Sequence, residues 1–303
     1  EKVTAINPKT ARAYSNMGNA YGIMGQLEME RGQDPSAPLT KAIACFQRAA
    51  ALNPSHSSAY INLGLARLAM AKYERAVGAK PASQIEMAIQ NCEEALIIKP
   101  DSIPALTGLA QGLQEKAERE LERGADASTT ERRARSVIEK VLRAAPDNPD
   151  GFLLLGNLEF LEAKVKESRL GSPEAPLRGA ERDLARSVQL QPQSPEPHLA
   201  LEELYAWRAE WKRKGGKACE REIQKGLSEG KAALALNPVQ AEAVALEGAL
   251  RLSLARSSTN PAARKEAARQ AAAAIERAIS MNPFLERRYK PLLEEARRLA
   301  SAR

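Results

Sequence analysis

The feature that most constrains the fold of this chain is a proline that returns at an almost constant interval. Five successive intervals are 46 residues and the sixth is 45. These prolines are Pro8, Pro54, Pro100, Pro146, Pro192, Pro238 and Pro283. A fixed period of this length predicts a repeat array, in which each unit buries its apolar face against its neighbours.

A second register lies ten residues after each proline. Five of the six repeats have a small residue there, namely Gly18, Gly64, Ala110, Gly156 and Gly248. The fifth repeat has Glu202 instead. Because small residues let two backbones approach closely, this register predicts a tight contact between helices in each repeat.

The patterns inside each repeat predict two helices joined by a turn. In the second repeat, Tyr60, Leu63, Leu68 and Ala71 have near-helical spacing, so a first helix is expected over residues 57–77. A glycine register suited to a helix C-terminal cap follows at Gly32, Gly78, Gly124 and Gly216. A proline register suited to the start of the second helix comprises Pro35, Pro81 and Pro173. Strand signals are absent, so we predict an all-α chain.

The residues of the first two repeats carry a more specific pattern. The first repeat reads Tyr14-x2-Met17-Gly18-x2-Tyr21, then Ala42-x3-Phe46, then Pro54. The second has Tyr60, Leu63, Gly64, Ala88, Cys92 and Pro100 at the same places. This order resembles the tetratricopeptide repeat (TPR), W-x2-L-G-x2-Y, A-x3-F, P over 34 residues, with 12 residues inserted between the two helices. The resemblance covers essentially the whole chain and implies a right-handed α-solenoid of antiparallel helix pairs.

We expect a single TPR-like array over residues 1–303. Residues 1–8 align with the end of a second helix, so we expect them to be the tail of a truncated preceding repeat in a longer protein. The expected repeats are 9–54, 55–100, 101–146, 147–192, 193–238 and 239–283. Residues 284–303 carry an amphipathic stripe and are predicted to form a capping helix.

Sequence motifs for catalysis are missing. Gly215-Gly216-Lys217 lacks the earlier glycine of a phosphate-binding loop and is followed by Ala218. Kinase and nucleophile-elbow signatures are also absent. The cysteines and histidines have neither a metal-ligand nor a disulfide spacing; they are Cys45, Cys92, Cys219, His56 and His198. We therefore expect no enzyme activity, no cofactor and no metal.

The apolar runs and the cysteines of the sequence indicate where in the cell the protein is expected. No apolar run approaches the roughly 18 residues of a membrane-spanning helix, so no membrane span is expected. The unpatterned cysteines suit a reducing compartment, and we predict a cytoplasmic protein.

The TPR resemblance also implies a function, because stacked repeats present an extended groove that binds a partner. We predict a non-catalytic scaffold that holds a partner peptide or helix in its concave groove. By resemblance, the groove residues are Arg12, Ser15, Asn19, Asn62, Leu65, Thr107, Gln111, Asn157, Phe160 and Glu203.

Asn19 and Asn62 fall at the two asparagine positions of the carboxylate clamp, with which some TPR proteins bind acidic chaperone tails. The basic positions of that clamp hold Ser15, Pro104 and Gly108. Without cations the clamp would not neutralise its ligand, so we exclude it. A hydrogen bond between adjacent repeats is the preferred role for Asn19 and Asn62.

Trp207 and Trp211 lie four residues apart and share one helix face. Exposed, they would be candidate binding hot spots. Their equivalents in other repeats are mostly apolar, so we favour core packing.

Three alternatives stay open. The lengthened repeats are similar to regions that follow the kinase domain in some bacterial serine/threonine kinases, where an array would regulate or dock substrates. Residues 238–303 hold 12 basic and 7 acidic residues, a net +5 of the chain's +7, which makes RNA binding a weaker hypothesis. The third is a homo-oligomer that forms through terminal repeats.

Overall fold

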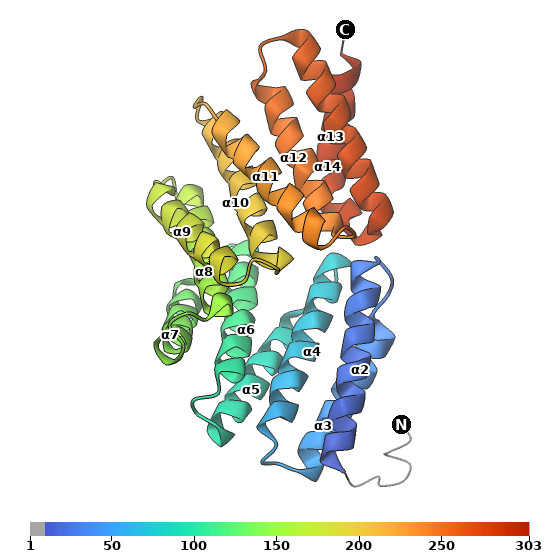
Figure 1. Ribbon diagram of the computed structural model, residues 1–303, viewed down its shortest axis with the longest axis vertical. Helices are drawn as coiled ribbons and strands as arrows, with labels where there is room; N and C mark the ends of the chain where they lie inside the picture. The colour runs from blue at the N-terminus through green and yellow to red at the C-terminus, as the bar shows by residue number, and fades with distance from the viewer. Residues whose placement is uncertain (1–9, 303) are drawn as a thin grey trace. The chain divides into compact units, whose positions relative to one another are not determined.

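The computed structural model describes residues 10–302, and it is built from helices arranged in consecutive pairs (Figure 1). No strand occurs among these residues, so the predicted all-α fold is confirmed. The predicted tail of a preceding repeat, residues 1–8, lies outside the described residues. The helices are α2 (Ala11–Glu30), α3 (Ser36–Leu52), α4 (Ser57–Ala76), α5 (Ala82–Ile98), α6 (Ile103–Glu122), α7 (Ser128–Ala144), α8 (Pro149–Ser168), α9 (Glu174–Leu190), α10 (Pro195–Lys214), α11 (Glu220–Leu236), α12 (Ala241–Ser257), α13 (Pro261–Met281), the 3-10 turn η1 (Pro283–Leu285) and α14 (Glu286–Ser301).

Helix lengths alternate with the repeat. The first helices of the first five pairs have 20 residues and the second helices have 17. In the last pair the order is reversed, with 17 residues in α12 and 21 in α13. The second helix starts one residue after the predicted proline, because Pro35, Pro81 and Pro173 occupy the N-cap.

The turn inside each of the first five pairs is a Schellman motif. After α2, the Gly32 N–H bonds the Met29 carbonyl and the Gln33 N–H bonds the Glu28 carbonyl. This motif needs a residue of positive φ, which the glycine register supplies with φ values of 64°, 80°, 71° and 66°. After α8 the same place is taken by Leu170, with a φ of 59°.

The two helices of a pair are held together by a small residue facing a large one. A Cβ on Gly18 would lie 2.6 Å from the Phe46 ring, and one on Gly248 would lie 2.5 Å from Ile275 Cγ1. Equivalent contacts join Gly64 to Cys92 and Gly156 to Leu184. The predicted tight contact is therefore real, and its other half is a side chain 27 or 28 residues later, which is large in three of these repeats and is Cys92 in the second.

The fifth pair reverses this arrangement. Glu202, the large exception in the register of small residues, faces Gly230, where the other repeats have the large side chain. A Cβ on Gly230 would overlap the Glu202 carboxyl group. The glycine thus makes the space that the carboxyl group fills.

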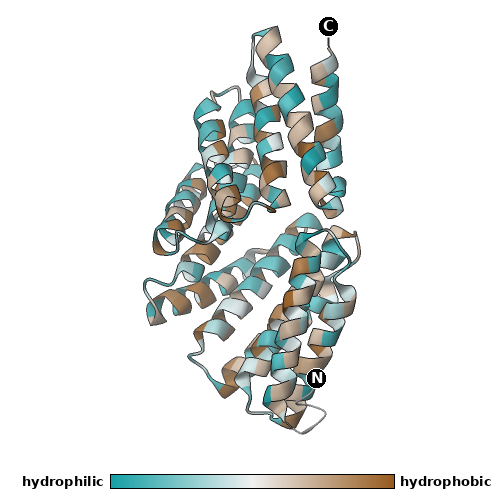
Figure 2. Ribbon diagram, turned by 45° about the vertical axis from the view of Figure 1, so that its right-hand side comes forward, coloured by the Kyte–Doolittle hydropathy of each residue, from teal (hydrophilic) through white to brown (hydrophobic). Residues whose placement is uncertain are grey.

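The chain divides into two compact units between Leu154 and Leu155, within α8. Inside each unit, hydrophilic and hydrophobic residues alternate along the helices (Figure 2). None of the helices between residues 10 and 302 combines the length and apolar character needed to cross a bilayer.

Candidate binding site

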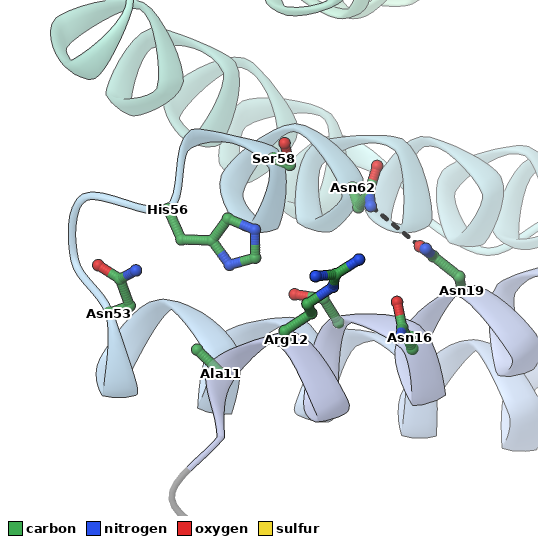
Figure 3. A pocket seen from close by; sticks show the side chains of 9 residues that line it. Ala11, Arg12, Asn16, Asn19, Asn53, His56, Ser58 and Asn62 are labelled. Atoms are coloured by element: carbon green, nitrogen blue, oxygen red, sulfur yellow. Dashed lines mark hydrogen bonds between the residues drawn. The ribbon is translucent and has the colours of Figure 1, made fainter.

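A cavity of about 330 Å³ lies in the first unit, between the first turns of α2 and α4 (Figure 3). The connection from α3 to α4 forms its third wall. The lining residues are Ala11, Arg12, Ser15, Asn16, Asn19, Asn53, His56, Ser58 and Asn62. Four of the ten predicted groove residues therefore meet here.

The repeated proline shapes the wall formed by the α3–α4 connection. Asn53 ends α3 with an extended backbone, φ −143° and ψ 90°, as expected for a residue before Pro54. Its side-chain oxygen accepts a hydrogen bond from the Ser55 N–H at 3.1 Å, and its carbonyl accepts one from the His56 N–H at 3.0 Å. These bonds hold His56 at the cavity.

A hydrogen bond between two repeats closes the far side of the cavity. The Asn62 amide nitrogen donates to the Asn19 side-chain oxygen at 2.9 Å (Figure 3). The predicted bond between these two asparagines is confirmed. Each amide keeps further hydrogen-bonding capacity.

Two polar atoms of the cavity wall are buried without a hydrogen-bond partner among the described residues. They are Ser15 Oγ and His56 Nδ1. The whole of Ser15 is only 7% exposed. Buried polar atoms are ordinarily paired, so these two unpaired atoms are exceptions to that rule.

Comparison with known proteins identifies the fold. No protein-family model matches the sequence, and neither does any curated protein. The crystal structure of TTC0263, a thermophilic TPR protein in Thermus thermophilus, superposes with a TM-score of 0.56 and 18% identity, over 80% of this chain and 99% of that chain. This chain has the TPR fold.

Two further solved structures are similar at lower scores. YrrB, described as a TPR protein with an unusual peptide-binding site, has a TM-score of 0.41 and 20% identity, over 84% of this chain and 97% of that chain. MamA has a TM-score of 0.40 and 14% identity, over 77% of this chain and 95% of that chain.

The other predicted residues of the first unit lie further along the TPR first helices. Leu65 on α4 is 40% exposed and lies against α6, where a Cβ on Gly108 would be 3.7 Å from Leu65 Cδ2. Thr107 and Gln111 on α6 are half-buried. These three residues do not line the cavity.

The predicted residues of the second unit are tied into packing and ion pairs. Phe160 is only 5% exposed, with the Trp207 ring edge-on at 5.8 Å and Lys164 Nζ 4.0 Å from its ring centre. Lys164 also pairs with Glu203 at 3.8 Å. Asn157 is half-buried.

Glu203 also pairs with Arg288 of α14 at 2.9 Å. Trp207 and Trp211 are both half-buried, so they are neither fully enclosed core residues nor fully exposed. Lys217 Nζ lies 5.1 Å from the centre of the Trp211 ring.

Five cavity residues are not among the ten predicted groove residues: Ala11, Asn16, Asn53, His56 and Ser58. The predicted groove positions all lie on first helices, whereas Asn53 and His56 lie in the connection between α3 and α4. Their signal was a position beside the repeated Pro54, together with the rarity of histidine in the chain.

The described residues offer little reactive chemistry. Cys45, Cys92 and Cys219 are all buried, and burial raises the pKa of the Cys92 thiol to about 12. Between residues 10 and 302, no three His, Cys, Asp or Glu side chains are grouped so that they could hold a metal ion.

Proposed function

We propose that this chain is a non-catalytic scaffold that holds a peptide or helix of a protein partner against its first helices. The observation that carries the proposal is the cavity between α2 and α4. Two adjacent repeats supply its polar lining, and two of its buried polar atoms have no partner among residues 10–302. The TPR fold supports the proposal, because stacked repeats offer an extended binding surface.

The residues around the cavity suit an extended peptide. Asn19 and Asn62 use one donor and one acceptor on each other, and their remaining amide groups can bond a peptide backbone. Leu65, 40% exposed further along α4, would contact an apolar side chain of the same peptide. The predicted contacts of Thr107, Gln111, Asn157, Phe160 and Glu203 with a partner stay predictions.

Selection from a random library of 12-residue peptides tests the proposal. We expect the wild-type chain to retain peptides, and the double variant Asn19→Ala, Asn62→Ala to bind them at least tenfold more weakly. Gln47→Ala, which removes an exposed amide on α3, is the matched control and should bind like wild type. If the library gave no binder, or if the double variant bound equally well, the proposal would be withdrawn.

The other expectations for partners and location stay predictions. Exposed Ile23, Met24 and Leu27 on α2 are where contact between copies through a terminal repeat would be sought. A docking region in a larger signalling protein, RNA binding and a cytoplasmic location have no support from the structure.

A further inference from the structure

The electrostatics of the cavity are one-sided. Arg12 is exposed and forms no ion pair with the described residues, and no carboxylate is among the lining residues. His56, the lining imidazole, brings no negative charge to the cavity. A negatively charged group would therefore enter the cavity without meeting a like charge.

The helix ends at the cavity favour the same sign of charge. The first turns of α2 and α4 contain no acidic residue, and neither N-cap side chain accepts a hydrogen bond from its helix. The first N–H groups of a helix have no partner within it, and they carry the positive end of the helix dipole. Two such ends meet at one cavity.

The unpartnered atoms supply the specific contacts. Ser15 Oγ is buried at the wall and can donate a hydrogen bond, and His56 Nδ1 can donate one in a suitable tautomer. A carboxylate accepts about four hydrogen bonds through its two oxygens. The cavity volume, about 330 Å³, admits a group of side-chain size.

We infer that this cavity binds an aspartate or glutamate carboxylate of the partner peptide. Arg12 pairs with the carboxylate, while Ser15 and His56 bond its oxygens. The inference rests on the proposed function, since it names the chemistry that the peptide must bring. The arrangement differs from the carboxylate clamp, because the clamp's basic positions hold Ser15, Pro104 and Gly108 here.

Two fluorescent pools of 12-residue peptides test the inference. The pools are identical except at one central position, which is Asp or Glu in one pool and Asn or Gln in the other. Retention on the full chain is measured at about 0.15 M salt, where charges beyond about 8 Å are screened. We expect the wild-type chain to retain the acidic pool at least fivefold better.

Three variants assign this preference to the cavity. Arg12→Gln and Ser15→Ala should each reduce it to less than twofold. Ser15→Ala should leave the melting temperature unchanged, since its hydroxyl has no partner among the described residues. Arg31→Gln removes the same charge at the opposite end of α2, about 28 Å away by helical rise, and should keep the full preference.

Each other result has a distinct meaning. Equal retention of both pools, or a preference that survives in Arg12→Gln, would overturn the inference but leave the proposed function standing. If neither pool were retained, the proposed function itself would fail, and the inference would fail with it.

Discussion

Glu202 is the residue whose surroundings depart furthest from its chemistry. It is fully buried in the second unit, and neither carboxyl oxygen has a hydrogen-bond partner among the described residues. Burial raises its pKa to about 9, and the nearby carboxylates of Glu247, Glu242 and Glu229 push in the same direction. The group is therefore a neutral acid at pH 7.

This protonation makes stability depend on pH. Between pH 4.5, the ordinary pKa, and about 9, the unfolded chain releases the Glu202 proton that the folded chain keeps. The free energy of unfolding should therefore fall as pH rises through this range. Three carboxylates face Glu202: Glu229 on α11, and Glu242 and Glu247 on α12. His198 is hydrogen-bonded to Glu229.

Urea unfolding at pH 5 and pH 9 measures this fall. We expect Glu202→Gln to lose less stability than wild type between the two pH values, because the amide does not titrate. Glu294→Gln, at an exposed position of α14, should keep the wild-type fall. Parallel pH profiles for wild type and Glu202→Gln would contradict the protonation assigned to Glu202.

The backbone of Leu170 is strained, and its side chain packs against no other part of the protein that the structure describes. Its φ of 59° is costly for leucine, and the side chain is 99% exposed. We predict that Leu170→Gly raises the free energy of unfolding by about 1 kcal/mol. Val77→Gly is the contrasting control, since Val77 caps α4 at an ordinary φ of −85° and glycine there should destabilise. Urea unfolding that ranked the two variants in the opposite order would refute the prediction.

At the scale of the element, a helix pair is closed by matching a small residue with a large one across an antiparallel contact. In the third repeat the register places Ala110 opposite Ile138, and both are fully buried. In the fifth, Glu202 and Gly230 exchange the two roles. The fifth pair should therefore accept the third pair's residues, but only when both are changed together.

A double-mutant cycle measures this coupling. Gly230→Ile alone forces a side chain into the Glu202 carboxyl group, and Glu202→Ala alone leaves a cavity beside a glycine. We predict that the double variant is more stable than either single variant, with a coupling energy of about 1–3 kcal/mol. Additive effects in urea unfolding would show that the two positions do not form a pair.

Element-scale features differed in how far the sequence could predict them. The turn glycines were predictable because only one residue type adopts positive φ freely, and Leu170 was missed because it breaks that rule. The pairing of Glu202 with Gly230 was not predictable, because it depends on how the two helices of the pair are aligned along each other. A second register of small residues, seventeen places after each proline, also indicates close contact between helices and was not used in the prediction. Its members are Gly25, Ala71, Ala117, Ala163, Ala209 and Ala255.

At the scale of the whole molecule, the repeat period and the compact units do not coincide. The 46-residue period runs without interruption past Leu154, yet the chain divides there, within α8. No composition change marks this point, so the sequence offered no sign of two units. The cavity residues on the first helices were predictable from the repeat register. Those of the α3–α4 connection were not, because their place at the cavity depends on how adjacent repeats stack.

Part of the basic charge at the C-terminal end is paired within the second unit. Arg256 pairs with Glu210 and Glu295, and Arg297 pairs with Glu276. These ion pairs join the last helices to one another. The capping role of this end and its contact with nucleic acid stay predictions.

Amide hydrogen exchange of the whole chain, with and without a selected 12-residue peptide, tests whether a partner binds between α2 and α4. We predict slower exchange on peptide binding over residues 11–19 and 53–62, the segments that form the cavity walls. Protection confined to residues 155–303, or no protection at all, would contradict the claim that this TPR scaffold binds its partner between α2 and α4.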